Sequence, residues 1–279
     1  KGWKPLVYCW RGGQRSGALS LVLGQIGFRV TIIEGGYKAF RNAMLADLPA
    51  QAQRLHYRVV CGPTGSGKTR LLHALQGAGA QVLDLEGLAQ HRASVLGLIP
   101  GQPQPSQKQF EMRVWDALRH FDASRPVYVE AESKKVGNCT VPDALMQAMR
   151  ASPCLRVDLP DHERVALLLE DYPFFVQDPD FFCQRLDTLV ALRGRAVVDE
   201  WKTQVHSGQT EAVVRDLLAR HYDPGYAAST QRNFSQFDQA GAVALADRSP
   251  AALAAAAQDI LAAPTPASPP RGKVSPASG

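Results

Sequence analysis

The chain has 279 residues, of which 45% are hydrophobic, and carries a formal net charge of +5. No stretch approaches the roughly 18 to 20 apolar residues of a membrane span, and no basic-then-apolar signal segment opens the sequence, so we expect a cytoplasmic protein without a membrane partner. The charge favours an anionic partner such as RNA or a phosphate ligand. Because the sequence has no C-x-x-C pair, we expect free thiols at Cys9, Cys61, Cys139, Cys154 and Cys183 rather than disulfides or a zinc site.

The first 48 residues alternate predicted strands and helices. An apolar run predicts a strand over residues 4–9, and helical spacing of apolar residues predicts a helix over 15–27. A strand over 30–33 and a helix over 37–45 follow. This order is typical of the end of an open parallel α/β sheet. Since the first strand has nothing before it to pair with, we expect residues 1–48 to be the back half of a domain, poorly held without its front half, with a linker over 49–56.

The loop after the first strand has the features that activate a thiol. Two glycines follow Cys9 and let consecutive backbone N–H groups turn inward, and Arg15 stands at the start of the predicted helix. An amide nest, a helix N-terminus and nearby cations favour thiolate over thiol. We therefore predict that Cys9 is a nucleophile and that Arg15 holds an anion beside it, with Arg11 and Ser16 as further candidates.

This loop resembles the active-site loop of the rhodanese superfamily, whose cysteine carries a transferred sulfur or selenium. Residues 34–40, Glu-Gly-Gly-Tyr-Lys-Ala-Phe, resemble the rhodanese segment that follows the next strand. The five-residue spacer between Cys9 and Arg15 is also the spacing of cysteine-dependent phosphatases. The loop alone does not decide between a sulfurtransferase and a phosphatase.

A complete G-x-x-x-x-G-K-[ST] motif follows the predicted linker. A strand-like segment precedes it and a helix-like segment follows it, as a phosphate loop requires. We expect the backbone amides to hold a diphosphate-like group, Lys68 to neutralise it, and the Thr69 hydroxyl to bind a magnesium ion. The predicted phosphate-binding residues are Gly62, Pro63, Thr64, Gly65, Ser66, Gly67, Lys68 and Thr69.

Residues 57–250 read as a doubly wound α/β domain with a helical C-terminal part. Strands are predicted near 57–61, 81–85, 127–130 and 155–158, and helices near 68–76, 107–121, 142–151 and 161–169. The proline-rich segment 99–106 predicts a loop, and beyond residue 170 the pattern is helical. Ser249-Pro250 favours the start of a last alanine-rich helix. We nevertheless assign 251–279 to an Ala/Pro-rich tail that is largely disordered.

Carboxylates follow two of these strands. Asp84 and Glu86 end the second strand of the domain, and Glu130 and Glu132 end the third. The carboxyl ends of parallel strands meet at the edge of the sheet where a phosphate-bound metal would lie. We expect Asp84, Glu130 and Glu132 to hold or orient such a metal, whereas Glu86 fits a solvent-facing position equally well.

Taken together, six stretches resemble the tRNA 2-selenouridine synthase family, which joins a rhodanese domain to a phosphate-loop domain. They are residues 8–16, 62–69, 84–92, 104–111, 129–133 and 221–224. The resemblance implies replacement of sulfur by selenium in 2-thiouridine at the tRNA wobble position. Selenophosphate would be the donor and Cys9 would carry the selenium; S-geranylation from geranyl diphosphate is also implied.

The partners implied by this resemblance are tRNA and small phosphate ligands, with magnesium as a candidate ion and without a bound redox cofactor. Phe110, Trp115 and the phenylalanines of 174–182 are candidates to line a prenyl pocket. The sequence does not specify an oligomeric state.

Three alternatives remain open at this stage. The first is an ATP- or GTP-binding kinase or regulatory NTPase with a vestigial rhodanese unit. The second is a rhodanese-type sulfurtransferase or phosphatase, and the third is a tRNA-binding protein without chemistry. Nucleotide turnover without tRNA or selenium would favour the first, and loss of function on changing basic residues but not Cys9 would favour the third.

Overall fold

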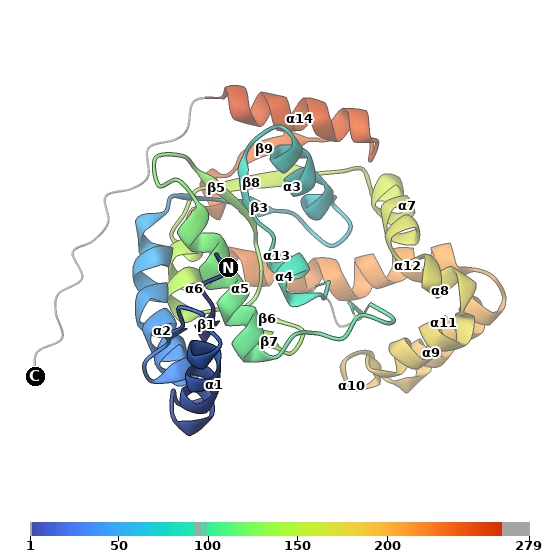
Figure 1. Ribbon diagram of the computed structural model, residues 1–279. Coiled ribbons are helices and arrows are strands. Elements are labelled where there is room, and N and C mark those ends of the chain that lie inside the picture. Colours follow the sequence, from blue (N-terminus) through green and yellow to red (C-terminus); the bar gives the residue numbers. More distant parts are fainter. Residues whose placement is uncertain (1, 93–95, 98, 264–279) are drawn as a thin grey trace, which may run out of the picture. The chain divides into compact units, whose positions relative to one another are not determined.

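The computed structural model describes residues 2–92, 96–97 and 99–263, and the chain divides into two compact units (Figure 1). Unit 1 comprises residues 1–53 and unit 2 comprises residues 54–279. In the described residues, no helix is both long enough and apolar enough to cross a membrane.

Unit 1 has the predicted order of strand, helix, strand and helix. Strand β1 (Leu6–Val7) pairs in parallel with β2 (Thr31–Ile32), and α1 (Gln14–Gln25) connects them. Parallel neighbours require such a crossover connection. Both strands are shorter than the sequence predicts, but the loop that contains Cys9 still lies between β1 and α1.

The second helix of unit 1, α2 (Gly36–Arg54), is 19 residues long and extends well past the predicted end at residue 45. Residues 49–54 belong to this helix, so that part of the expected linker is wrong. Pro49 lies inside the helix and removes one backbone N–H. The buried residues Met44, Leu48 and Ala52 nevertheless keep a spacing of four, so the buried stripe runs through the proline.

Unit 2 is built on a parallel five-stranded sheet in the order β4-β5-β3-β8-β9. The strands are β3 (Tyr57–Cys61), β4 (Gln81–Leu83), β5 (Val127–Glu130), β8 (Cys154–Asp158) and β9 (Gly241–Ala244). The first four confirm the prediction. The sequence analysis missed β9, an edge strand of small residues that is largely exposed. All of β3 is buried at the centre of the sheet, and the phosphate loop follows it.

Helices cover both faces of this sheet, as predicted for a phosphate-loop α/β domain (Figure 1). On one face α3 (Lys68–Gly77) packs against α14 (Pro250–Ala262) and shares a core with the sheet. On the other lie α5 (Gln107–His120) and α6 (Asp143–Arg150). Residues 99–106 form the expected loop.

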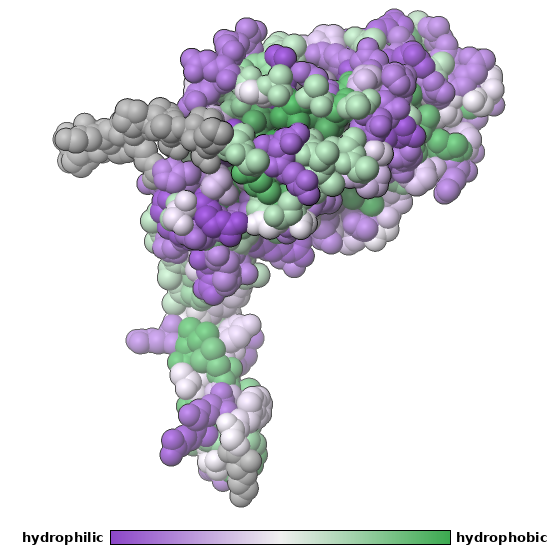
Figure 2. Space-filling view, turned by 90° about the horizontal axis from the view of Figure 1, so that it is seen from above, coloured by the Kyte–Doolittle hydropathy of each residue, from purple (hydrophilic) through white to green (hydrophobic). Residues whose placement is uncertain are grey.

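Helix α14 corrects the expected tail over 251–279. Ser249 accepts a hydrogen bond from the Ala252 N–H and caps the helix, as the Ser-Pro pair predicts. Leu253, Ala257 and Ile260 are buried in the core shared with α3, so residues 251–262 are part of the folded domain. Figure 2, which looks onto this side of unit 2, shows apolar side chains gathered over α14. Residues 264–279 lie outside the described part of the chain.

The helical C-terminal part has its own core around Phe182, Leu186 and Trp201. Its elements are α7 (Asp161–Asp171), α8 (Pro173–Gln177), α9 (Pro179–Asp187), α10 (Val190–Arg193), α11 (Arg195–His206), α12 (Thr210–Leu217), the π-helical turn η1 (Leu218–Tyr222), α13 (Asp223–Asn233) and the 3₁₀ turn η2 (Phe237–Gln239). A short helix α4 (Leu85–Ala89) and a hairpin of β6 (Lys135–Val136) and β7 (Cys139–Thr140) complete unit 2.

Candidate functional site

The thiol of Cys9 lies between β1 and α1 and accepts a hydrogen bond from a loop amide. The Gly13 N–H lies 3.2 Å from the Cys9 sulfur, and the Ser16 hydroxyl lies 3.3 Å from it. Ser16 is buried, and its single hydroxyl proton is shared between two acceptors: it is donated to the Gly13 carbonyl, 3.0 Å away, when Cys9 is a thiol and to the sulfur when Cys9 is a thiolate. Cys9 is half-buried, whereas the other four cysteines are buried. Cys9 is therefore the accessible thiol among them.

Main-chain contacts hold the cysteine loop in place. The Tyr37 and Lys38 N–H groups, in the first turn of α2, donate to the carbonyls of Cys9 and Trp10 at 2.9 and 3.0 Å. Gly36 has a φ of +60°, and a Cβ atom there would overlap the Cys9 carbonyl. Because α2 binds the carbonyls, the loop amides are left to face the sulfur. The fraying expected for this loop stays a prediction.

Hydrogen bonds lower the pKa of Cys9 from 9.0 to about 6. The largest cause is the side-chain hydrogen bond with Ser16, followed by the backbone of Ser16; the amides of Arg11 and Gly13 contribute less. The predicted effect on the thiol thus comes mainly from Ser16 and the loop amides. The side chains of Arg11 and Arg15 are exposed, and Arg15 lies on the first turn of α1.

We expect the rate of alkylation of Cys9 to follow the fraction of thiolate. The rate should rise with pH to a plateau with a midpoint near 6, because the folded protein stabilises the thiolate. Replacing Ser16 with alanine should move this midpoint upward. Iodoacetamide labelling measured by mass spectrometry would give both midpoints, with the four buried cysteines as internal controls. A wild-type midpoint near 9 would contradict the geometry.

The phosphate loop joins the central strand to α3 as the motif requires. Gly65 and Gly67 have φ values of +78° and +85°, and Gly67 is the residue before the first turn of α3. The ammonium group of Lys68 donates to the carbonyls of Gly62 and Pro63 at 2.6 and 3.2 Å. The loop amides at the start of a helix form an anion site. The Ser66 hydroxyl is fully buried and has no partner among the described residues.

A cavity of about 460 Å³ opens over this loop. Residues 64–70 line it, together with Glu86 and Glu132 from the sheet side and with residues of α7, η1 and α13 from the helical part. Its cationic side chains include Arg92, which forms an ion pair with Asp171 at 3.3 Å and lies over the ring of Tyr172. The cavity therefore extends well beyond the phosphate loop.

The four carboxylates that follow the strand ends differ in their contacts and in their burial. Asp84 caps α4 by accepting from the Gly87 N–H, and it also contacts His73. Glu86 accepts a hydrogen bond from the Thr69 hydroxyl at 3.2 Å and lines the cavity. Glu132 lines the cavity as well, whereas Glu130 is buried and accepts from the backbone N–H of Glu86 at 2.9 Å. Glu86 is therefore the carboxylate that contacts Thr69, the expected magnesium ligand.

Burial, together with the charges of Asp84 and Glu86, raises the pKa of Glu130 to about 8. Burial also raises the pKa of Glu132, with Glu86 and Glu130 as further causes. Three carboxylates close to one another cannot all ionise readily without a cation. Within the described ranges, no group of three His, Cys, Asp or Glu side chains is arranged to hold a metal ion.

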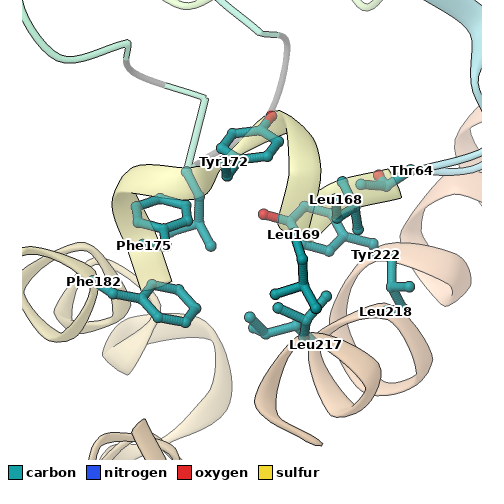
Figure 3. Close-up of a pocket in the computed structure, with 11 residues that line it drawn as sticks. Thr64, Leu168, Leu169, Tyr172, Phe175, Phe182, Leu217, Leu218 and Tyr222 are labelled. Carbon is teal, nitrogen blue, oxygen red and sulfur yellow. The ribbon is translucent and has the colours of Figure 1, made fainter. Parts of the chain in front are cut away.

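An apolar slot adjoins the cavity (Figure 3). Phe175 and Phe182 face it from α8 and α9, and Leu217 and Leu218 face it from the end of α12 and from η1. The slot and the cavity share four lining residues, Thr64, Leu168, Tyr172 and Tyr222. An apolar space thus opens directly beside a phosphate loop.

Of the aromatic residues expected to line a prenyl pocket, Phe175 and Phe182 line this slot. Phe110 is buried in α5, and Trp115 of the same helix packs against the guanidinium of Arg119. Phe174 and Phe181 pack around Phe175 without lining the slot.

Sequence analysis missed a buried arginine that supports the phosphate loop. Arg164 of α7 donates from Nε and Nη2 to the Thr64 carbonyl, at 3.1 and 2.8 Å. The same guanidinium binds both carboxylate oxygens of Asp223 at 2.6 and 3.1 Å and one of Asp161 at 3.1 Å. All five N–H donors of Arg164 are thereby used. Asp223 lies in the 221–224 stretch, whose residues had no assigned role.

Comparisons with known proteins agree with this geometry. Residues 55–180 match the profile described as "tRNA 2-selenouridine synthase AAA domain". The chain is 34% identical over 249 residues to the tRNA 2-selenouridine synthase of Aeromonas salmonicida, covering 79% of this chain and 66% of that protein. It is 34% identical over 248 residues to the same enzyme of Alcanivorax borkumensis, covering 79% and 67%. For Marinobacter nauticus the values are 39% over 169 residues, 60% and 44%. The matches thus span 44–67% of the lengths of these relatives.

Proposed function

The chain belongs to the tRNA 2-selenouridine synthase family, and we propose that the protein replaces sulfur by selenium in 2-thiouridine at the wobble position of tRNA. Selenophosphate is the proposed selenium donor and tRNA the macromolecular partner, which gives the protein a cytoplasmic role. Within this proposal, unit 1 is the C-terminal half of a rhodanese-like domain. The acidic thiol of Cys9, in an amide-lined loop, supports that assignment.

The selenium step has a definite electron balance. Selenium in selenophosphate is at the same oxidation level as selenium in the product, so exchange with sulfur needs no net oxidant. In an S–Se⁻ group on Cys9, sulfur and selenium together hold two electrons fewer than a thiolate and a selenide do separately. Loading breaks the Se–P bond, releases phosphate and passes two electrons to an acceptor such as a disulfide. On transfer, a thiol returns the two electrons, selenium bonds to C2 of the base, and the C2–S bond breaks with release of hydrosulfide. We propose that Cys9 carries selenium in this form.

For unit 2 we propose S-geranylation of 2-thiouridine from geranyl diphosphate. The observation that carries this proposal is the apolar slot that shares Thr64 and three other residues with the phosphate-loop cavity. The loop amides and Lys68 would hold the diphosphate. The slot has an open volume of about 40 Å³, so its side chains would have to move apart to hold the isoprenoid chain. The bond between C1 and the diphosphate oxygen breaks, a bond between sulfur and C1 forms, the diphosphate leaves with the electron pair, and the base loses its N3 proton.

The residues around Thr69 fit a magnesium ion. The Thr69 hydroxyl and the Glu86 carboxylate, 3.2 Å apart, are hard oxygen ligands, and diphosphate oxygens would complete the set. A bound magnesium ion would offset the charge of the leaving diphosphate. Glu132 lines the same cavity. The buried Glu130 holds the backbone of Glu86 by accepting a hydrogen bond from its N–H.

A larger side chain in the slot tests the proposal directly. Val214 of α12 lines the slot without lining the phosphate-loop cavity, so Val214→Phe should obstruct the isoprenoid chain. We expect the KM for geranyl diphosphate to rise about tenfold, because roughly 1.4 kcal/mol of apolar contact is lost. The affinity for inorganic diphosphate, measured by isothermal titration, should stay unchanged.

The control variant is Val176→Phe, at an exposed position of α8. It should leave both quantities unchanged. A Val214→Phe variant that keeps the wild-type KM would contradict the assignment of the slot. If ATP instead bound tightly and was hydrolysed without tRNA, the alternative of a regulatory NTPase would replace the transferase.

A further inference from the structure

One wall of the cavity adds no formal charge to the phosphate loop, although its Tyr226 hydroxyl accepts a hydrogen bond from the Gly62 N–H. It is formed by one face of α13 together with His221 of η1, and its α13 residues include Gly225, Tyr226, Ser229 and Asn233. These residues recur at helical spacing and carry no formal charge. A cavity of about 460 Å³ lies in the range of roughly 300–1,000 Å³ that holds drug-sized molecules. The cavity therefore has space beside this wall for a second ligand group, in addition to the diphosphate, that carries no charge.

His221 is held in one orientation and one tautomer. The Nε atom of Arg193 lies 3.0 Å from the Nδ1 atom of His221, and Nη2 of the same arginine donates to the His221 carbonyl at 3.4 Å. Since a guanidinium can only donate, Nδ1 must accept, and the proton of a neutral ring is on Nε2. Burial lowers the pKa of His221, and the charge of Arg193 lowers it further. The ring thus presents an N–H donor without a positive charge.

This chemistry suits a heterocyclic carbonyl better than a phosphate. A phosphate favours cationic donors and helix N-termini, which the phosphate loop already supplies. A neutral imidazole N–H matches the exocyclic oxygen of a pyrimidine. Farther along α13, the Asn233 amide donates to the carbonyl and hydroxyl of Ser229 at 2.8 and 3.2 Å, which leaves the Asn233 Oδ1 atom and the Ser229 hydroxyl proton for other polar groups in the cavity. The acceptor base must also reach the C1 atom of the prenyl donor inside the same cavity.

We propose that this wall is the subsite for the acceptor base, a 2-thiopyrimidine of RNA, and that the Nε2–H of His221 donates to a carbonyl oxygen of that base. The inference rests on the geranyl transfer proposed above. It assigns a role to His221, which the sequence analysis quoted without explaining. Arg193 also lines the cavity, and in this arrangement it is a positioning residue because its Nε atom fixes the ring of His221.

Gly225 allows the subsite to be filled without disturbing the backbone. It lies in α13 with a φ outside the left-handed region, and no atom lies within 4 Å of the place where its Cβ would be. Since glycine is a poor helix former, a larger residue there does not weaken the helix. Gly225→Leu should therefore occupy the subsite while the protein folds normally. Ala227, exposed on the same helix and not part of the cavity wall, offers the matched control Ala227→Leu.

The experiment compares two RNA hairpins that differ only at the wobble position. One carries 2-thiouridine and the other an abasic site, and their affinities are measured with inorganic diphosphate saturating the phosphate loop. We expect the wild type to prefer the thiouridine hairpin about tenfold, the effect of a stacked and hydrogen-bonded base. Gly225→Leu should remove this preference and leave the dissociation constant of diphosphate unchanged, whereas Ala227→Leu should retain both.

A second pair of variants tests the donor itself. His221→Phe should lose the preference, and His221→Gln should keep most of it because the glutamine amide also donates. No preference in the wild type, an unchanged preference in Gly225→Leu, or weaker diphosphate binding in that variant would overturn the inference. Failure of diphosphate to bind the wild type would instead overturn the proposed use of the phosphate loop, so the two failures are distinct.

Discussion

Replacing Lys68 with alanine should weaken the binding of inorganic diphosphate by roughly ten- to a hundredfold. The ammonium group now donates to the carbonyls of Gly62 and Pro63, so it is already folded over the loop that would hold the ligand. A charge-assisted hydrogen bond contributes roughly 1.5 to 3 kcal/mol, which corresponds to this range of affinities. Isothermal titration with diphosphate and with geranyl diphosphate measures the effect.

Two variants make the result specific to this position. Lys68→Arg keeps the charge but places it on a planar fork, and it should recover only part of the affinity. Lys202→Ala removes a lysine that pairs with Asp187 on the surface of the helical part, and it should change nothing. Equal affinities of the wild type and Lys68→Ala for both ligands would refute the role of the loop.

The sequence was sufficient to predict the sheet where the signals are local. Strands β3 and β5 are fully buried and mostly apolar, although β3 includes Arg58 and β5 ends at Glu130. The glycine pattern after β3 is typical of a phosphate loop between a strand and a helix. Strand β9 was missed because Gly241–Ala244 is a short edge strand of small residues with little burial. The predicted end of helix α2 at residue 45 and the linker expected from Pro49 were wrong because the buried stripe of Met44, Leu48 and Ala52 continues through the proline.

The candidate site was predictable only where its residues are adjacent in the chain. The phosphate loop and the contact between Cys9 and Ser16 lie within single loops. Arg164 and Asp223, by contrast, are 59 positions apart and meet only because α7 and α13 both approach the loop. The slot likewise depends on how α7, α8, α9 and α12 pack. A spacing of carboxylates after a strand also did not show that Asp84 would cap α4 while Glu86 faced Thr69.

Replacing Cys9 with serine in the chromosomal gene should abolish selenouridine in tRNA while S-geranyl-2-thiouridine persists. The thiol is the half-buried cysteine with a pKa near 6, so at neutral pH it is mostly thiolate. A serine hydroxyl keeps the size and hydrogen bonds of the side chain but stays protonated, and it forms no stable bond to selenium. Nucleoside analysis by mass spectrometry reports both modifications in one sample.

The pattern across variants separates the two halves of the proposed activity. Lys68→Ala in the same gene should remove geranylation, because the diphosphate loop is lost, whereas Cys9→Ser should spare it. Ser16→Ala should lower selenouridine only partly: it raises the pKa of Cys9 without removing the sulfur, so the deficit should shrink as the pH of a purified assay is raised. Wild-type selenouridine in the Cys9→Ser strain would exclude Cys9 as the selenium carrier and leave direct attack by selenophosphate, which needs no oxidant, as the route to the product.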